Sequence, residues 1–222
     1  MKVKVFFTAV IILFVVYATT SFAQHKPHAP GADKKPLQQI TAFPGQVTGW
    51  VNNDDFIYEG FYLQSGNTKY MVKFPTHMGI ELTAAVKTGN TATVNGVEKA
   101  SATGEKEINL VSILADGKTI NESTPAKVAT PPAKELTTAS GKITLLQKDR
   151  HGKVNGFILE NKTILRVSQP VAEQILKLAV VGTTISCTGE KQNLHNGEAT
   201  AEVYTIIRCK TITINGKQYL TK

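Results

Sequence analysis

Histidines and cysteines are the residues of this chain best suited to bind a metal or to act as nucleophiles. The histidines are His25, His28, His77, His151 and His195. No two of them have the i, i+4 spacing that places paired imidazoles on one face of a helix to bind zinc. The sequence also lacks a Gly-x-Ser-x-Gly nucleophile motif, a phosphate-binding loop and a dinucleotide fingerprint. We therefore expect a protein that is not an enzyme and has no metal site or cofactor.

Aromatic side chains in the first half of the chain offer a different chemistry, which is non-covalent contact. Side chains alternate between faces along a strand, so a strand over residues 56–63 would place Phe56, Tyr58 and Tyr62 on one face. Trp50 and Tyr70 are expected to lie beside them. An exposed aromatic face of this kind would bind a glycan, a peptide or a partner protein. The alternative is that these rings pack against another part of the chain.

The N-terminus indicates export. Lys2 and Lys4 precede an apolar run over residues 5–18, and the small residues Ser21 and Ala23 follow at positions suited to signal peptidase. The run is short for a membrane span, so we interpret residues 1–23 as a cleaved signal peptide, with an uncleaved anchor as the alternative. The mature chain would then have no membrane span and would be periplasmic or extracellular. Residues 24–44 form a polar, proline-containing segment that predicts a flexible leader.

An internal repeat organises the rest of the chain. Gly60-Phe61-Tyr62-Leu63 returns as Gly156-Phe157-Ile158-Leu159, 96 positions later, and Gly45 returns as Gly141 at the same distance. Further glycines and a proline recur in the second half at nearly the same spacing, which predicts a duplicated domain. We place the first repeat at residues 45–120 and the second at 136–222. A proline-containing linker over residues 121–135 separates them.

Each repeat indicates a small β-barrel. In the first repeat, turn residues separate expected strands at 46–51, 56–63, 69–74, 91–94 and 107–114, with a helix-like segment at 75–87. Five strands with one helix between the third and fourth match the oligonucleotide/oligosaccharide-binding barrel, or OB-fold. An immunoglobulin-like sandwich, the alternative, has about seven strands and no such helix. The predicted fold class is all-β with short helices, as two tandem five-stranded OB-fold barrels.

The order of these motifs resembles that of a known group of proteins. The chain resembles the small exported OB-fold proteins of bacteria, with the bacterial OB-fold (BOF) group as the nearest named relative. The resemblance is carried by Gly-x-Val at residue 45, Gly-Phe-x-Leu at residue 60 and Pro75 before a short helix. The resemblance covers both repeats and implies a fold and export. Its motifs are structural, so it implies no active-site residue. Phe74-Pro75 is replaced by Gln169-Pro170 in the second repeat, and this difference argues against a ligand site shared by the two repeats.

Two further features bear on the second repeat. Its cysteines, Cys187 and Cys209, could form a disulfide in an oxidising compartment or remain as two buried thiols. The second repeat is basic but poor in aromatic residues, whereas the first is rich in aromatics but slightly acidic. Single-strand binders need aromatic platforms inside a positive groove, so this separation disfavours nucleic acid as a ligand.

These features together favour an exported, non-catalytic binding or interaction protein. Its candidate contact residues are Trp50, Phe56, Tyr58, Tyr62 and Tyr70, and its ligand would be a glycan, a peptide or an envelope protein. The alternative is a structural or envelope-assembly spacer. Single-strand nucleic-acid binding and an enzyme are the less favoured readings. The turn at residues 52–55 predicts a simple hairpin, because it lacks the ligand number of a calcium loop.

Overall fold

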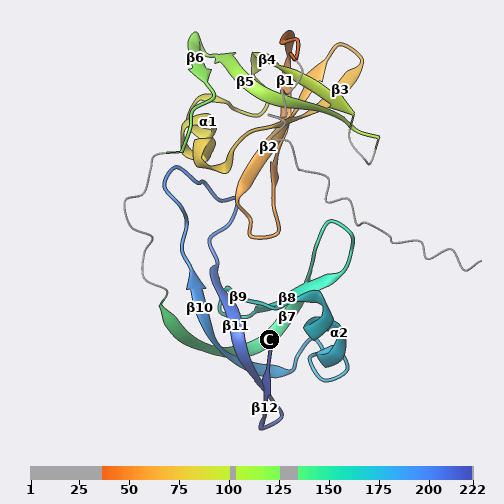
Figure 1. Cartoon of the computed structure of the whole chain (residues 1–222), viewed down its shortest axis with the longest axis vertical. Coiled ribbons are helices and arrows are strands. Elements are labelled where there is room, and N and C mark those ends of the chain that lie inside the picture. The colour runs from red at the N-terminus through yellow and green to blue at the C-terminus, as the bar shows by residue number, and fades with distance from the viewer. Residues whose placement is uncertain (1–36, 101–103, 126–134, 222) are drawn as a thin grey trace, which may run out of the picture. The chain divides into compact units, whose positions relative to one another are not determined.

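The computed structural model describes residues 37–100, 104–125 and 135–221 (Figure 1). Gln38–Lys222 forms one compact unit. The expected signal peptide, the leader up to residue 36 and residues 126–134 of the linker lie outside the described residues. Within the described residues, no helix is both long and apolar enough to cross a membrane.

Barrel 1 comprises residues 41–121 and is built from six strands and a short helical segment. The strands are β1 (Thr41–Asn52), β2 (Tyr58–Ser65), β3 (Thr68–Lys73), β4 (Thr91–Ala100), β5 (Lys106–Ala115) and β6 (Lys118–Asn121), with η1 (Thr76–Met78) and α1 (Gly79–Ala85) between β3 and β4. The sheet order is β3-β2-β1-β4-β5-β6. Parallel pairing of β3 with β5 closes the first five strands into a barrel.

Barrel 2 comprises residues 136–220 and repeats this arrangement. Its elements are β7 (Leu136–Lys148), β8 (Val154–Leu159), β9 (Thr163–Arg166), α2 (Gln169–Ile175), β10 (Thr184–Gln192), β11 (Thr205–Ile214) and β12 (Lys217–Leu220). β9 pairs with β11 in parallel and β10 pairs with both β7 and β11, so the circular order matches that of barrel 1. The predicted fold class is confirmed, because both repeats are closed five-stranded barrels.

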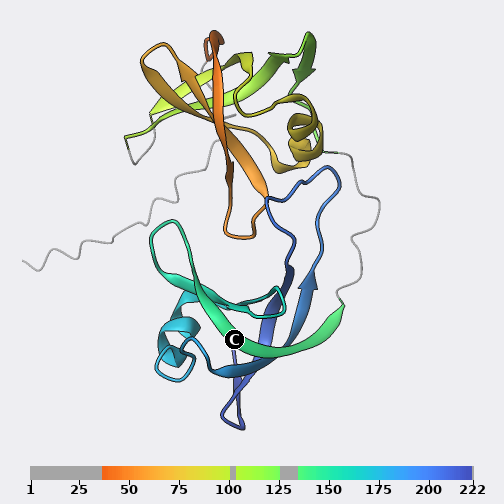
Figure 2. The same ribbon diagram turned by 180° about the vertical axis from the view of Figure 1, so that it is seen from behind.

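The alternation of side chains along the strands explains the two cores. Phe61 and Leu63 in β2 are completely buried, and their counterparts Phe157 and Leu159 in β8 are buried as well. α1 contributes Leu82 to the core of barrel 1. Figure 2 shows α1 lying beside the strands of barrel 1 and α2 beside those of barrel 2. Each helix therefore helps to fill its own barrel.

The two barrels share their irregularities as well as their strands. The two register shifts between β1 and β2, at Val47/Gly49 and Val51/Asn52, recur between β7 and β8. The shift between β4 and β5 at Asn95/Gly96 recurs between β10 and β11 at Thr188/Gly189. A Cβ atom on Gly96 or Gly189 would lie 2.4 or 2.1 Å from a carbonyl oxygen of the next strand. The spaced glycines of the sequence are thus explained by close approach of backbones at matching bulges.

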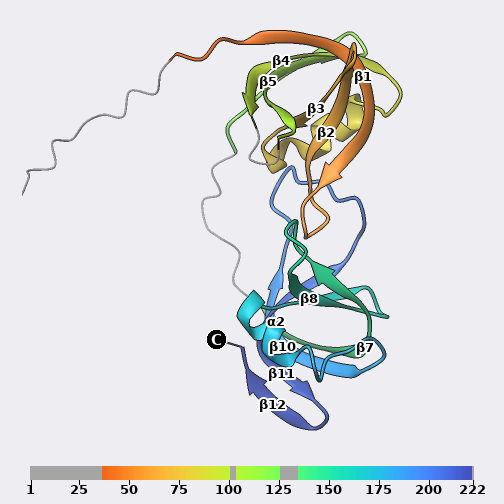
Figure 3. The ribbon, with the colours of Figure 1, turned by 90° about the vertical axis from the view of Figure 1, so that its right-hand side faces the viewer.

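The predicted element boundaries differ from the structure in several places, among them the second strand, which was predicted at residues 56–63 and is observed at Tyr58–Ser65. β1 begins at Thr41, inside the predicted leader, and β4 continues through Asn95-Gly96 to Ala100, because that dipeptide pairs with β5 opposite a bulge at Val111 and does not form a turn. The predicted helix over residues 75–87 is a 3₁₀ turn followed by the short α1. β6 and β12 were not predicted. Each forms a hairpin with the preceding strand, and Figure 3 shows the β11–β12 hairpin extending from barrel 2.

Candidate binding site

The outer surface of β2, β3 and β5 in barrel 1 carries an amphipathic patch that we call the open face. Its members are Tyr62, Lys69, Met71, Lys73 and Glu107, none of them fully buried. Tyr62 lies opposite Met71 across the β2–β3 pair, and Met71 lies opposite Glu107 across β3–β5. Lys69 Nζ lies 3.8 Å from the centre of the Tyr62 ring, and Lys73 Nζ lies 2.9 Å from Glu107 Oε1. The open face therefore has an apolar centre bordered by charged groups.

Two of the predicted contact residues, Trp50 and Tyr58, pack against the core of barrel 1 instead. Val51 pairs with Gly60 and Asn52 pairs with Tyr58, so Glu59 is an extra residue in β2. This bulge turns Tyr58 to the inner side, where its ring centre lies 5.2 Å from that of Trp50. The simple alternation used to place Tyr58 beside Tyr62 does not hold across the bulge.

Tyr70 also lies away from the open face. It alternates with Met71 along β3 and is buried in the barrel, with its ring centre 5.1 Å from that of Phe43. Of the five predicted contact residues, Tyr62 alone belongs to the open face.

Phe56 belongs to a separate feature, the loop between β1 and β2, which we call the docking loop (residues 53–57). Asn53 Oδ1 accepts hydrogen bonds from the backbone N–H of Asp55 and of Ile57, at 2.9 and 3.1 Å. This arrangement presents Phe56, whose ring stacks on Tyr204 of barrel 2 with centres 4.7 Å apart. The predicted turn at residues 52–55 thus begins a loop that contacts the second barrel.

The surface of barrel 2 that receives the docking loop is called the acceptor face. Its apolar part consists of Ile158, Ile164 and Ile206, which form a buried cluster against Phe56 and Tyr204. These isoleucines come from β8, β9 and β11. They point outward from barrel 2, where Phe56 of the docking loop and Tyr204 of barrel 2 cover them.

The polar part of the acceptor face is centred on Arg166, whose side chain is only 10% exposed. Its guanidinium donates to the carbonyl oxygen of Asp54 at 2.8 Å and forms an ion pair with the carboxylate of Asp55. Gln192 Nε2 donates to the other oxygen of Asp55 at 2.9 Å, and Asn155 Nδ2 donates to Asp54 Oδ2 at 2.8 Å. Both aspartates of the docking loop are therefore hydrogen-bonded by barrel 2.

The open face and the acceptor face are the same surface in the two repeats. Strand pairing aligns Phe61 and Val72 with Phe157 and Leu165, which matches the outward residues as well. The matched pairs are Tyr62 and Ile158, Met71 and Ile164, Lys73 and Arg166, and Glu107 and Ile206. Barrel 2 thus has isoleucines where the surface is covered, and barrel 1 has amphipathic and charged residues where no described segment covers it.

The loop between β10 and β11 (residues 193–204) adds main-chain contacts with barrel 1. The backbone N–H of Tyr58 donates to Ala199 O at 2.9 Å, and that of Ile80 donates to Gly197 O at 2.9 Å. Gly197 has a φ of 84°, and a Cβ atom there would lie 1.9 Å from His77 O. Glycine is required at this position for both reasons.

Two titrating groups near these loops have shifted pKa values. Desolvation acts to raise the pKa of Asp149, but hydrogen bonds from the backbone of Lys153 and His151 hold it below its ordinary value. Burial, together with a hydrogen bond to Glu202, raises the pKa of Tyr204.

The histidines do not come together in the part of the chain that the structure describes. His77 Nε2 lies 2.8 Å from the carbonyl oxygen of Ser123, and His151 and His195 are exposed in loops. His25 and His28 lie outside the described residues. No group of three or more His, Cys, Asp or Glu side chains among the described residues could hold a metal ion.

Cys187 and Cys209 are joined in a disulfide between β10 and β11, with their Cα atoms 5.7 Å apart. Cys187 is buried among the core residues of barrel 2, and Cys209 packs against them. The pair therefore packs with the core of barrel 2.

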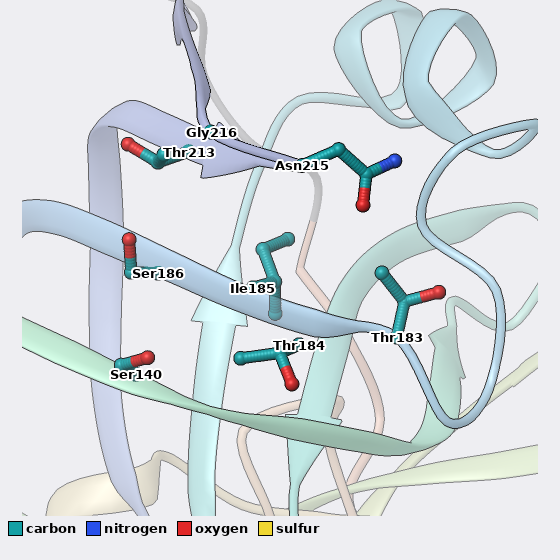
Figure 4. A pocket seen from close by; sticks show the side chains of 8 residues that line it. All are labelled: Ser140, Thr183, Thr184, Ile185, Ser186, Thr213, Asn215 and Gly216. Carbon is teal, nitrogen blue, oxygen red and sulfur yellow. The ribbon is translucent and has the colours of Figure 1, made fainter.

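Two grooves lie at matching positions away from both faces. The groove in barrel 2 has a volume of about 500 Å³ and is lined by uncharged polar residues such as Thr184, Ser186 and Asn215 (Figure 4). The corresponding groove in barrel 1 measures about 560 Å³ and includes Thr93 and Asp116. Neither lining contains an aromatic side chain, so we place the candidate site on the open face.

The comparisons with known proteins identify no family for this chain. No protein-family model matches the chain, and no curated protein matches it. One solved structure that matches is the crystal structure of the tetrameric p202 HIN2, at 10% identity and a TM-score of 0.25, over 78% of this chain and 93% of that chain. A match at this identity and TM-score carries nothing about a ligand of this chain.

Proposed function

We propose that this chain is an exported, non-catalytic binding protein that holds a polypeptide partner on the open face of barrel 1. One observation carries the proposal: the same face of barrel 2 is covered by a polypeptide segment, the docking loop. The open face is the corresponding surface of barrel 1, so it is placed to accept a segment of another protein in the same way. The signal-like N-terminus and the resemblance to exported bacterial OB-fold proteins support export.

The composition of the open face supports a protein partner over a glycan or nucleic acid. Tyr and Met are enriched at protein interfaces, where Tyr often supplies a large share of the binding energy and Met adapts to the shape of its partner. The ion pair between Lys73 and Glu107 leaves the face with little net charge at its centre. A polyanion would need unpaired basic groups along its path.

A structural spacer is the second candidate function, and it has its own supporting observation. Trp50 and Tyr58 pack internally, and Phe56 joins the two barrels. In this alternative the aromatic residues hold the molecule together and Tyr62 contacts no partner.

Site-specific crosslinking separates these candidates. A photoreactive amino acid at position 62 of the mature chain should crosslink to a defined protein in the native envelope fraction, whereas one at position 114 on β5 should not. Leu114 is a matched control because it is exposed in the same barrel but lies outside the open face.

The affinity of the purified pair then gives the decisive measurement. Tyr62→Ala with Met71→Ala should weaken binding at least about tenfold, and Leu114→Ala should leave it unchanged. Equal affinity of the double variant and the wild type would refute the proposal. So would the absence of a crosslinked protein at position 62.

A further inference from the structure

We propose that the acceptor face of barrel 2 is a second binding site, specific for an acidic segment followed by an aromatic residue. The docking loop fills this site within the molecule, and a partner protein that presents the same chemistry displaces the loop. This site lies in barrel 2 and does not depend on the function proposed for the open face.

The acceptor face is shaped by residues of barrel 2 and not by the loop. Arg166 Nη1 donates to Asn155 Oδ1 at 2.6 Å, which fixes the guanidinium. Arg208 Nε donates to Gln192 Oε1 at 3.0 Å, which directs the amide nitrogen of Gln192 toward the ligand. Groups held in place before binding lose little conformational freedom when the ligand arrives. Both of these contacts lie within barrel 2 and are made without the loop.

The same residues select the chemistry of the occupant. Arg166 and Gln192 each contact a different oxygen of the Asp55 carboxylate, so both lone-pair sides of that group are recognised. The isoleucine cluster and Tyr204 receive the ring of Phe56. A guanidinium that is nine-tenths buried requires an anion, because an unpaired charge in this environment is strongly unfavourable. An aspartate followed by an aromatic residue satisfies both halves of the site.

The docking loop has an unfavourable backbone conformation at one residue. Phe56 has a φ of 60°, a region that residues with a Cβ atom adopt at a cost. The matching residue in barrel 2 is Gly152, with a φ of 76°. A partner segment that presents an aspartate and a ring without this backbone conformation avoids the cost. Displacement of the loop is favoured by that difference.

The site also extends beyond the area that the loop covers. A cavity of about 80 Å³ lies beside Asp55 and Tyr204, and its lining includes Leu194 and Val203. These two side chains are 55% and 80% exposed. A segment longer than the docking loop can cover them and gain apolar contact that the loop does not provide.

The test uses the full mature chain and a fluorescent peptide with the sequence of residues 51–58. The receptor carries Asp54→Ala, Asp55→Ala and Phe56→Gly, which remove the side chains that occupy the acceptor face. Glycine is chosen at position 56 because barrel 2 has Gly152 at the matching position. We expect this receptor to bind the peptide in a fluorescence anisotropy titration, and wild type to bind it at least about tenfold more weakly, since the tethered loop competes at high effective concentration. Adding Arg166→Ala to the receptor should abolish binding, as should Asp→Asn changes in the peptide.

The controls separate this proposal from the one for the open face. Tyr62→Ala with Met71→Ala should leave peptide binding unchanged, and Arg150→Ala with His151→Ala in the matching loop of barrel 2 should not create a binding site. If the triple variant fails to fold, Asp55→Ala with Phe56→Gly serves as the receptor, because this pair of changes removes both the carboxylate bound by Arg166 and the ring stacked on Tyr204. A folded receptor that does not bind the peptide overturns the proposal, as does binding that survives Arg166→Ala.

Discussion

Phe56 and Gly152 occupy the same turn position in the two barrels, and both have a left-handed backbone, with φ of 60° and 76°. The turns are alike in other respects, since Asn53 and Asp149 each accept hydrogen bonds from the backbone N–H two and four residues later. A phenylalanine in this region costs about 1 kcal/mol relative to glycine. The stacking of its ring on Tyr204 and its packing on three isoleucines explain why the costly residue is present.

This relationship predicts an unusual order of stability at position 56. Both Phe56→Gly and Phe56→Ala should lose about 2 kcal/mol of packing, but the alanine variant should be less stable than the glycine variant by about 1 kcal/mol. Urea unfolding followed by fluorescence measures both free energies. Gly152→Ala is the matched control, and it should lose about 1 kcal/mol without any change in packing. An alanine variant at least as stable as the glycine variant would contradict the prediction.

The ion pair between Arg166 and Asp55 should contribute far more to stability than the ion pair between Lys73 and Glu107 on the open face. Its side chains are 10% and 16% exposed, whereas Lys73 and Glu107 are 37% and 15% exposed. Arg166→Ala should cost about 3 kcal/mol, because Asp55 is left without its charged partner.

Double-mutant cycles give the comparison directly. We expect a coupling energy of about 2 kcal/mol for Arg166 with Asp55 and below about 1 kcal/mol for Lys73 with Glu107. Equal coupling energies in the two pairs would show that burial by the docking loop does not strengthen the bond.

The fold could be predicted from the sequence because its determinants are local and occur twice. Gly96 and Gly189 occupy matching positions in the two repeats because each permits the next strand to approach closely at a bulge. Phe61 and Phe157 recur because each fills a core. The hairpins at Asp116-Gly117 and Asn215-Gly216 have the positive φ angles of two-residue turns, so the turn signal for β6 and β12 was present in the sequence.

The candidate site could be predicted only in part, because it depends on register and on contacts between repeats. Tyr62 was placed on the outer surface correctly by alternation, but Tyr58 was not, since the bulge at Glu59 reverses the alternation. The acceptor face was missed entirely. Nothing along the chain links Asp55 to Arg166, which lies in another strand of another repeat. The signal that could have found it is the replacement of Tyr62 and Met71 by Ile158 and Ile164 at matching outward positions.

The bulge at Glu59 makes a prediction that separates Tyr58 from Tyr62. Tyr58→Ala removes a ring that packs on Trp50 and the core, and should cost about 2 kcal/mol of unfolding free energy. Tyr62→Ala removes a surface ring and should change that free energy by less than about 1 kcal/mol. Chemical unfolding monitored by circular dichroism measures both. Similar losses in the two variants would mean that the rings are equally buried.

Reduction of the disulfide should weaken barrel 2. Cys187 and Cys209 are separated by 22 residues in the sequence, and a loop of this length corresponds to about 3 kcal/mol of stabilisation through the unfolded state. Thermal unfolding with and without a reducing agent measures the effect. The variant with both cysteines changed to alanine should unfold identically in the two conditions. A wild type that is equally insensitive would show that the bond does not contribute to stability.

Because of Asp149, the stability of barrel 2 should depend on pH in the acid range. Hydrogen bonds from the backbone of Lys153 and His151 overcome the effect of desolvation and lower the pKa of this carboxyl below its ordinary value of 3.8. A group whose pKa is lower in the folded state stabilises the protein above the unfolded pKa and loses that contribution as the pH falls through the folded pKa. Wild type should therefore lose stability in this range relative to a variant that cannot titrate.

Asp149→Asn supplies that variant, because barrel 1 already has Asn53 at the matching position with the same two backbone hydrogen bonds. The asparagine also loses one acceptor for Gln169, and that loss is present at every pH, so the change with pH is the diagnostic quantity. The difference in melting temperature between the two proteins should be constant well above pH 3.8 and should shift against wild type below it. Parallel curves down to the acid limit of folding would show that the Asp149 carboxylate is bound no better in the folded chain than in the unfolded one.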